Sequence, residues 1–204
     1  SIYIQMNVST DYLLKNVTPN KPLLTTVSKE LFTYFEKRSL FKAASYLSES
    51  LINQHVEVLD SELRSKMERY VSLKVGTTAP DVQLTPTKKL RDINNNILLV
   101  FGSSECGYCL DDKKKLETYY SKWQSEGTLE LVYISIDTNK ALFDQTYSNT
   151  PWQTYCDLKG WNTQGAKDYF VNATPTYVVL DKDLKILLHP KSVEHVEAWV
   201  SVNL

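Results

Sequence analysis

The sequence predicts an α/β domain that follows an α-helical N-terminal region. An apolar run at 97–101 precedes a long amphipathic segment, and a second apolar run follows at 129–136. Strand, helix and strand in so short a stretch form a βαβ unit. In the first third of the chain, apolar residues recur at steps of three and four, which is the period of a helix. We therefore expect a helical region over 1–73 and an α/β domain over 74–204.

The N-terminal region divides into a lead-in and a series of helices. Residues 1–24 mix Asn, Thr, Pro and Lys with few apolar residues, so we expect them to be irregular. Over residues 25–70 the spacing predicts two or three amphipathic helices. Breaks are expected near Ser39 and Asn53.

Glycine and proline mark the entry to the second domain. The segment 75–81 carries Gly76 and Pro80, both of which interrupt helices. Residues 82–84 and 89–91 have the composition of two short strands. A domain boundary is therefore expected before this segment.

The βαβ unit is expected to form a parallel strand pair. The strand at 97–101 leads through a tight turn into a helix that begins at Gly107. The run at 129–136 is rich in β-branched residues and predicts the next buried strand. A right-handed crossover should connect the two strands.

Residues 139–170 are expected to form an insertion before the last strands. A helix is predicted at 141–147, an extended stretch at 152–158 and a second helix at 164–170. The insertion therefore separates the βαβ unit from the rest of the sheet.

A hairpin and a helix are expected to close the chain. Residues 176–181 and 186–188 predict two strands joined by a polar turn. The residues Val193, Val196 and Val200 lie on one face of a predicted final helix.

The most informative motif is the pair Cys106 and Cys109 at the strand-to-helix turn. Two cysteines three positions apart on the first helical turn can form a disulfide with little backbone movement. The positive end of a helix favours a thiolate, so Cys106, the more exposed of the two, should have a lowered pKa. A thiolate beside a second thiol is the chemistry of disulfide exchange.

Two other interpretations of the cysteine pair remain open. A structural zinc site needs four ligands, and beyond this motif the chain offers only Cys156, His55, His189 and His195, none of them paired at ligand spacing. A purely structural disulfide would close a very short loop and would constrain the unfolded chain little. We therefore expect no metal.

Composition excludes several classes of function. The chain has 204 residues and a net charge of −1, which gives no electrostatic basis for binding nucleic acid. No apolar run approaches the roughly 18 residues of a membrane span. Because the sequence starts at Ser1 without a methionine, a removed signal or anchor segment is compatible with it.

The motifs together resemble the thioredoxin fold. The residues that carry the resemblance are Cys-Gly-Tyr-Cys at 106–109 and Ala-Thr-Pro-Thr at 173–176, which enters the predicted hairpin. The segments 75–81 and 152–169 are similar to the entry and inserted sections of TlpA-like (redoxin) thiol–disulfide oxidoreductases, including Bacteroidetes-type forms with a helical N-terminal region. The resemblance covers about 74–204 and implies a three-layer domain with a central mixed sheet.

The resemblance implies roles for individual residues. Cys106 would be the attacking thiolate and Cys109 the resolving thiol. Pro175 matches the cis-proline of the family, and the backbone of Thr174 would bind the partner polypeptide. Tyr108 would contact the same partner.

Asp112 is a candidate proton-transfer residue. It shares a helix stripe with Cys109, Leu116 and Trp123, one turn from the predicted resolving thiol. Burial would raise its pKa, and an acid in this place could exchange protons with Cys109. Asp112 could equally be a solvated residue in a charged run.

Glu105 departs from the superfamily pattern, in which tryptophan often precedes the first cysteine. A carboxylate beside Cys106 opposes thiolate formation unless the carboxylate points into water. We therefore expect Glu105 to modulate the reactivity of Cys106.

Cys156 and two tryptophans lie in the predicted insertion. We expect Cys156 to be a buried free thiol, while a third redox thiol is the alternative. Trp152 and Trp161 are expected in the core, with a place in a substrate groove as the alternative.

The resemblance implies a thiol–disulfide oxidoreductase that needs no cofactor beyond its own disulfide. Partners would be proteins with disulfides or thiols, and nucleic acid is not expected. An extracytoplasmic reductant, recharged by a membrane electron donor, is the expected form, although electron-flow direction and oligomeric state stay open. A thiol peroxidase and a non-catalytic binding module are the alternatives.

Overall fold

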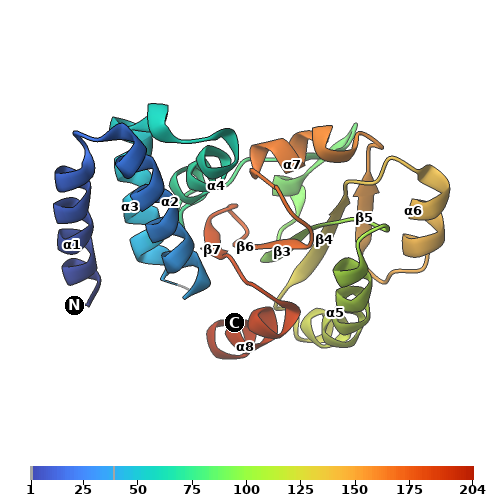
Figure 1. Cartoon of the computed structure of the whole chain (residues 1–204). Helices are drawn as coiled ribbons and strands as arrows, with labels where there is room; N and C mark the ends of the chain where they lie inside the picture. The colour runs from blue at the N-terminus through green and yellow to red at the C-terminus, as the bar shows by residue number, and fades with distance from the viewer. Residues whose placement is uncertain (1, 39) are drawn as a thin grey trace. The chain divides into compact units, whose positions relative to one another are not determined.

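The computed structural model describes residues 2–38 and 40–204 and divides into two compact units, residues 1–74 and 75–204. The first unit is α-helical, and the second contains a mixed sheet flanked by helices (Figure 1). Within the described residues, no helix is both long and apolar enough to cross a bilayer.

The N-terminal unit is a set of helices around its own core. The helices are α1 (Ile2–Val17), α2 (Lys21–Lys37), α3 (Phe41–Gln54) and α4 (Ser61–Ser72), with a short 3-10 turn η1 (Val56–Val58). Asn20 caps α2 and Asp60 caps α4, because each side chain accepts a backbone N–H of the first turn. Apolar side chains from all four helices fill the core, among them Leu14, Phe32, Leu47 and Met67. Burial of these faces holds the unit together.

The irregular lead-in predicted for residues 1–24 is wrong. These residues form α1 and the start of α2, because Thr10 and Leu14 bury one side of α1. Pro22 lies in the first turn of α2, where a proline costs no hydrogen bond. Prolines in this stretch therefore begin a helix instead of preventing one.

The predicted breaks between the helices can be compared with the observed ends. The break near Asn53 is confirmed, since α3 ends at Gln54. Ser39 itself lies outside the described residues, but α2 ends at Lys37 and α3 begins at Phe41 on either side of it.

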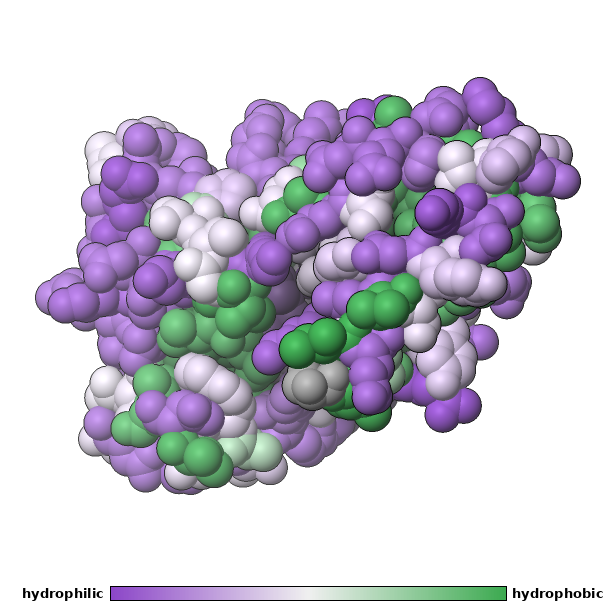
Figure 2. Space-filling model, turned by 90° about the vertical axis from the view of Figure 1, so that its left-hand side faces the viewer, coloured by the Kyte–Doolittle hydropathy of each residue, from purple (hydrophilic) through white to green (hydrophobic). Residues whose placement is uncertain are grey.

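Helix α1 exposes apolar side chains on its outer side. Ile4, Val8 and Tyr12 follow one another at steps of four, and each is more than 60% exposed. The face of the molecule drawn in Figure 2 shows apolar residues as separate green areas within a mostly polar surface. Residues four apart are neighbours on a helix, so Ile4, Val8 and Tyr12 form one exposed apolar stripe along α1.

The C-terminal unit contains a five-stranded sheet in the order β5-β4-β3-β6-β7. The strands are β1 (Gln83–Thr85), β2 (Lys88–Lys89), β3 (Ile97–Gly102), β4 (Glu130–Ser135), β5 (Gln153–Cys156), β6 (Thr176–Leu180) and β7 (Ile186–Leu188). Strands β3, β4 and β5 are parallel to one another, whereas β6 is antiparallel to both β3 and β7. The predicted parallel pair, the terminal hairpin and the mixed sheet are confirmed.

Helices cover both faces of this sheet. They are α5 (Gly107–Glu126), α6 (Lys140–Tyr147), α7 (Gln164–Asp168) and α8 (Val193–Asn203), with 3-10 turns η2 (Leu90–Asp92) and η3 (Gly160–Asn162). Figure 1 shows α5 and α8 on one side of the sheet and α7 on the other. Successive side chains of β3 point to opposite faces of the sheet. Val100 joins the core beneath α5, whereas Phe101 packs against Tyr169 at the end of α7.

Helix α7 is shorter than predicted. It ends at Asp168, and Phe170 adopts a left-handed backbone conformation with φ 47°. A residue in that conformation stops a helix, which the apolar pattern over 164–170 does not reveal.

Candidate active site

The site is built on the turn between β3 and α5. Gly102 ends β3 beneath the side chain of Tyr133, where any Cβ would overlap the phenol ring. The chain turns over Ser103 and Ser104, and Cys106 becomes the N-cap of α5 in an extended conformation. The turn therefore presents a cysteine sulfur at the positive end of a 20-residue helix.

The two cysteines of the motif form a disulfide, and their Cα atoms lie 5.2 Å apart. Cys106 Sγ accepts a hydrogen bond from the backbone N–H of Cys109 at 3.2 Å. Cys109 is 2% exposed, whereas Cys106 is only partly buried. As predicted, Cys106 is the sulfur that another molecule can reach.

The loop before β6 lies against the disulfide. The Thr174–Pro175 peptide bond is cis, so the isomer implied by the resemblance is confirmed. The carbonyl oxygen of Thr174 lies 3.4 Å from Cys106 Sγ, although the two residues are 68 positions apart. The fold thus brings the two sequence motifs together, and Thr174 contributes a backbone group at the accessible sulfur.

Asp112 lies one turn beyond Cys109 and is held by two other side chains. Its side chain is 15% exposed, and it accepts a hydrogen bond from the hydroxyl of Tyr177. Lys115 Nζ is 3.2 Å from the other carboxylate oxygen and 2.8 Å from Glu194 of α8. Asp112 is therefore fixed in a network and is not the freely solvated residue of the alternative interpretation.

Tyr177 was not anticipated from the sequence. Burial first, and then the hydrogen bond to Asp112, raise the pKa of Tyr177 far above its ordinary value. The phenol therefore keeps its proton and donates a hydrogen bond to the Asp112 carboxylate. The only signal in the sequence is that Tyr177 follows Pro175 by two positions.

The surface near the cysteines carries exposed side chains. Tyr108, between the two cysteines, is 79% exposed, and Glu105 points into solvent. Exposure weakens the influence of the Glu105 carboxylate on Cys106. Trp161 is 53% exposed, so its expected place in the core is wrong, whereas Trp152 is buried as expected.

Asp137 is the second residue that the sequence did not reveal. It lies two residues after the end of β4 and is 2% exposed, and its carboxylate accepts hydrogen bonds from Ser103, Ser104 and Ser135. Two of these serines belong to the turn that carries Cys106. A single Asp after a strand gives no signal of such a contact.

Cys156 lies at the end of β5, opposite Ser135 of β4. Its side chain is partly buried, and its Sγ lies 3.5 Å from the carbonyl oxygen of Asp137. The thiol is free, as expected, and forms no disulfide with the Cys106–Cys109 pair.

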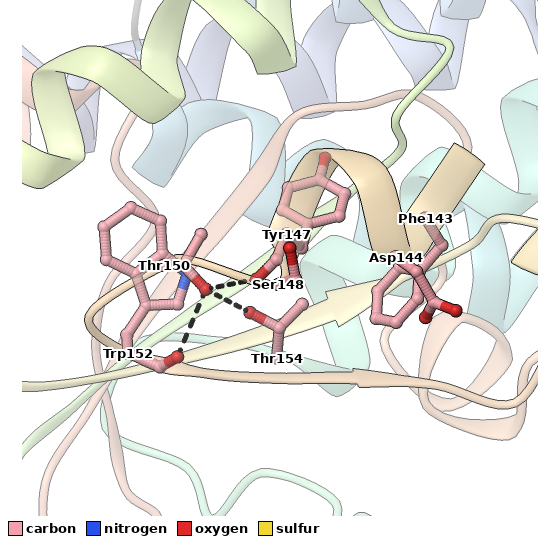
Figure 3. A pocket seen from close by; sticks show the side chains of 7 residues that line it. All are labelled: Phe143, Asp144, Tyr147, Ser148, Thr150, Trp152 and Thr154. Atoms are coloured by element: carbon pink, nitrogen blue, oxygen red, sulfur yellow. Dashed lines mark hydrogen bonds between the residues drawn. The ribbon is translucent and has the colours of Figure 1, made fainter. Parts of the chain in front are cut away.

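A pocket of about 280 Å³ lies between α6 and β5 (Figure 3). Its lining residues are Phe143, Asp144, Tyr147, Ser148, Thr150, Trp152 and Thr154. Thr150 Oγ1 is hydrogen-bonded to the carbonyl of Tyr147 and to Thr154 within it. None of the predicted site residues lines this pocket, so it is separate from the cysteine chemistry.

Within residues 2–38 and 40–204, no group of three or more His, Cys, Asp or Glu side chains is arranged to hold a metal ion. Both sulfurs of the Cys-Gly-Tyr-Cys motif are engaged in the disulfide.

Comparison with known proteins identifies the class of the C-terminal unit. A family model described as thioredoxin-like matches residues 94–186. No curated protein matches the sequence at a significant level.

Solved structures share the fold at low sequence identity. A thioredoxin-like protein from Bacteroides caccae has a TM-score of 0.79 and 16% identity, covering 99% of this chain and 78% of that chain. A thiol–disulfide oxidoreductase from Bacteroides fragilis has a TM-score of 0.56 and 23% identity, covering 63% of this chain and 100% of that chain. The thioredoxin domain of a thiol–disulfide oxidoreductase from Bacteroides vulgatus has a TM-score of 0.57 and 17% identity, covering 64% and 98%. Together with the observed topology, these matches show that the C-terminal unit has a thioredoxin-like fold.

Proposed function

We propose that the chain is a thiol–disulfide oxidoreductase that exchanges electrons with disulfides of partner proteins through Cys106 and Cys109. One observation carries the proposal: the Cys106–Cys109 disulfide lies at the start of α5, with the carbonyl oxygen of Thr174 beside the accessible sulfur. The thioredoxin-like family match supports the same class of chemistry.

The reaction starts from the reduced pair. The thiolate of Cys106 attacks one sulfur of a partner disulfide, a mixed disulfide forms, and the other partner sulfur leaves as a thiolate. Cys109 then loses its proton and attacks Cys106 Sγ, which releases the second partner thiolate. The partner gains two electrons and the chain is left with the Cys106–Cys109 disulfide.

Neighbouring groups have defined tasks in this proposal. Asp112 receives the proton of Cys109, because it lies one helical turn away and is held as a hydrogen-bond acceptor by Tyr177. The backbone of Thr174 binds the partner polypeptide next to Cys106, and the exposed ring of Tyr108 contacts it. Glu105 modulates the thiolate from the solvent side.

We further propose that the reaction takes place outside the cytoplasm, where protein disulfides persist and need a reductant. A membrane electron donor would then return the Cys106–Cys109 pair to its dithiol form. No cofactor other than this disulfide takes part in the scheme.

Insulin reduction tests the proposal. The chain with dithiothreitol should precipitate insulin B chains faster than dithiothreitol alone, and Cys106→Ser should remove this acceleration. Cys109→Ser should instead accumulate a mixed disulfide, which mass spectrometry detects. Cys156→Ser is the matched control and should keep the activity of the unmodified chain, since Cys156 lies outside the disulfide.

Two results would contradict the proposal. A chain that accelerates insulin reduction no more than Cys106→Ser does would be a binding module with an inert disulfide. Rapid turnover of hydrogen peroxide without reduction of protein disulfides would identify a thiol peroxidase.

A further inference from the structure

The proposed reaction gives no role to Asp137, whose buried carboxylate accepts hydrogen bonds on both oxygens. One oxygen, Oδ1, accepts from Ser103 Oγ at 2.8 Å, from Ser104 Oγ at 2.7 Å and from Ser104 N at 3.0 Å. The other, Oδ2, accepts from Ser135 Oγ at 2.5 Å and shares Ser104 N at 3.1 Å. All contacts therefore come from groups that can donate.

Two of the serine hydroxyls also accept backbone N–H groups. Ser103 Oγ accepts the backbone N–H of Glu105 at 3.1 Å, and Ser135 Oγ accepts the backbone N–H of Asp137 at 3.0 Å. A hydroxyl has one proton and two lone pairs, so each of these serines can donate to the carboxylate while it accepts an N–H. The surroundings of Asp137 therefore suit a carboxylate that only accepts hydrogen bonds.

The charge on Asp137 has no counter-ion in the described part of the chain. None of the ion pairs there includes Asp137, and all of its hydrogen-bond partners are uncharged. The residue is 2% exposed, so water screens the charge poorly. Its electrostatic effect therefore extends into the neighbouring structure.

The nearest reactive group along the chain is Cys106. Asp137 binds Ser104, two positions before Cys106, and the N–H of Cys106 donates to the carbonyl of Ser103 at 3.2 Å. Two residues of chain span at most about 7 Å, and the contact to Ser104 and the Cys106 side chain add about 3 Å each, so charge and sulfur are within roughly 13 Å of each other. Because the interior screens a charge poorly, a like charge within this distance disfavours a thiolate.

We propose that Asp137 is a positioning residue that holds the 103–104 turn and, through its charge, makes the Cys106–Cys109 pair a stronger reductant. A group that stabilises the thiolate stabilises the reduced form and makes a pair oxidising. Asp137 acts in the opposite sense, because it destabilises the thiolate and so favours transfer of two electrons from the dithiol to a partner disulfide. The inference rests on the proposed function and gives the direction in which electrons flow.

The reduction potential of the full chain tests this inference. The protein is equilibrated in dithiothreitol redox buffers, thiols are alkylated, and the dithiol fraction is measured by mass spectrometry. Asp137→Asn should shift the equilibrium constant about tenfold toward the dithiol, which is about 30 mV for two electrons. The thiolate absorbance of Cys106 should also appear at lower pH.

Three further variants separate charge from structure. Asp144→Asn removes an equal charge from the exposed surface of α6 and should leave the potential unchanged. Ser135→Ala loosens the same network but keeps the charge, so it should not make the pair more oxidising. Asp137→Ser is a second neutral variant, whose hydroxyl can still accept the Ser104 N–H, and it should shift the potential in the same direction as Asp137→Asn.

The inference is overturned if a folded neutral variant at Asp137 shifts the equilibrium constant less than twofold. It is also overturned if Ser135→Ala shifts it toward the dithiol as far as Asp137→Asn does. Because the potential is measured against a small-molecule buffer, it can be obtained even for a chain that fails to reduce insulin. Failure of the proposed function and failure of this inference are therefore distinguishable.

Discussion

Two carboxylates, Asp112 and Asp137, surround the cysteine turn, and they differ in what holds them. Asp112 is bound by a phenol and a lysine at the protein surface, whereas Asp137 is bound only by serines and backbone in the interior. The side chain of Asp112 is 15% exposed, whereas Asp137 is 2% exposed. In the scheme proposed above, one carboxylate takes part in proton transfer and the other sets the potential of the pair.

Tyr177→Phe should slow the second half of the reaction. The variant removes the hydrogen bond that holds Asp112, and loss of a hydrogen bond to a charged group should slow the attack of Cys109 roughly 3- to 10-fold. Ellman's reagent reports this step in a Cys156→Ser background, which removes the free third thiol. The reduced chain then releases a first coloured thiolate when Cys106 attacks and a second when Cys109 resolves.

Tyr169→Phe is the matched control for this prediction. Tyr169 is equally buried, and its hydroxyl donates to the carbonyl of Pro80 away from Asp112. It should leave the second release unchanged, and in an Asp112→Asn background Tyr177→Phe should have no further effect. An equal slowing of both thiolate releases would contradict a role that acts through Asp112.

The sequence predicts the site residues that lie close together along the chain, and it misses those that only the fold brings together. Cys106, Cys109 and Asp112 follow one another on a helix, so their proximity follows from the chain itself. The contact of Tyr177 joins β6 to α5 over 65 positions, and that of Asp137 joins the segment after β4 to the turn over 33 positions. No periodicity encodes such distances.

At the scale of elements, the end of β3 controls how the turn is formed. Gly102 lies against the phenol of Tyr133, which hydrogen-bonds to Tyr147 at 2.9 Å. A methyl group there cannot be accommodated without moving a buried ring pair. The close approach of the turn to β4 therefore requires glycine.

Gly102→Ala should lower the free energy of unfolding by about 1–3 kcal/mol, the range typical of overpacking a core. Urea unfolding followed by tryptophan fluorescence measures the change. Gly107→Ala is the matched control, because nothing lies within 4 Å of its Cβ position and alanine is the better helix former. A loss of stability in Gly107→Ala as large as in Gly102→Ala would contradict this account.

Elements were predictable where apolar periodicity dominates. Strands β3 and β4 and the start of α5 agree with the pattern, since the two strands are continuous buried apolar runs and α5 buries one stripe of its surface. Helix α1 was missed because only Thr10 and Leu14 are buried in it. Several of its apolar residues, among them Ile4 and Val8, are exposed, so its apolar pattern does not mark one buried stripe. A helix with so narrow a buried side is stabilised by its neighbours and has little signal of its own.

At the scale of the whole molecule, buried tyrosines are a common feature of both units. Burial raises the pKa of Tyr147 to about 12. Burial is also the largest cause of a raised pKa for other tyrosines in the two cores, namely Tyr70, Tyr120, Tyr133, Tyr169 and Tyr177. The folded chain therefore holds phenol protons that the unfolded chain releases near pH 10.

Stability should consequently fall as the pH rises above about 10. Unfolded tyrosines lose their protons there while the folded ones retain them, so the unfolded state binds fewer protons and the slope of stability with pH is negative. Melting temperatures measured from pH 8 to pH 12 should be flat at first and then decline. Ultraviolet titration should show phenolate absorbance rising together with loss of the circular dichroism signal, and full ionisation of all tyrosines in a folded chain would contradict the prediction.

The four residues from Thr174 to Tyr177 have one consequence for how such a protein can evolve. In the proposed reaction, Thr174 lies beside the sulfur that attacks the partner disulfide, and Tyr177 hydrogen-bonds to the acid near the sulfur that releases the partner. Recognition of the partner and release of the partner therefore both depend on one short stretch of backbone. A substitution that widens the range of clients by shifting this stretch will also retune how fast each client departs, so selection cannot adjust one trait and spare the other.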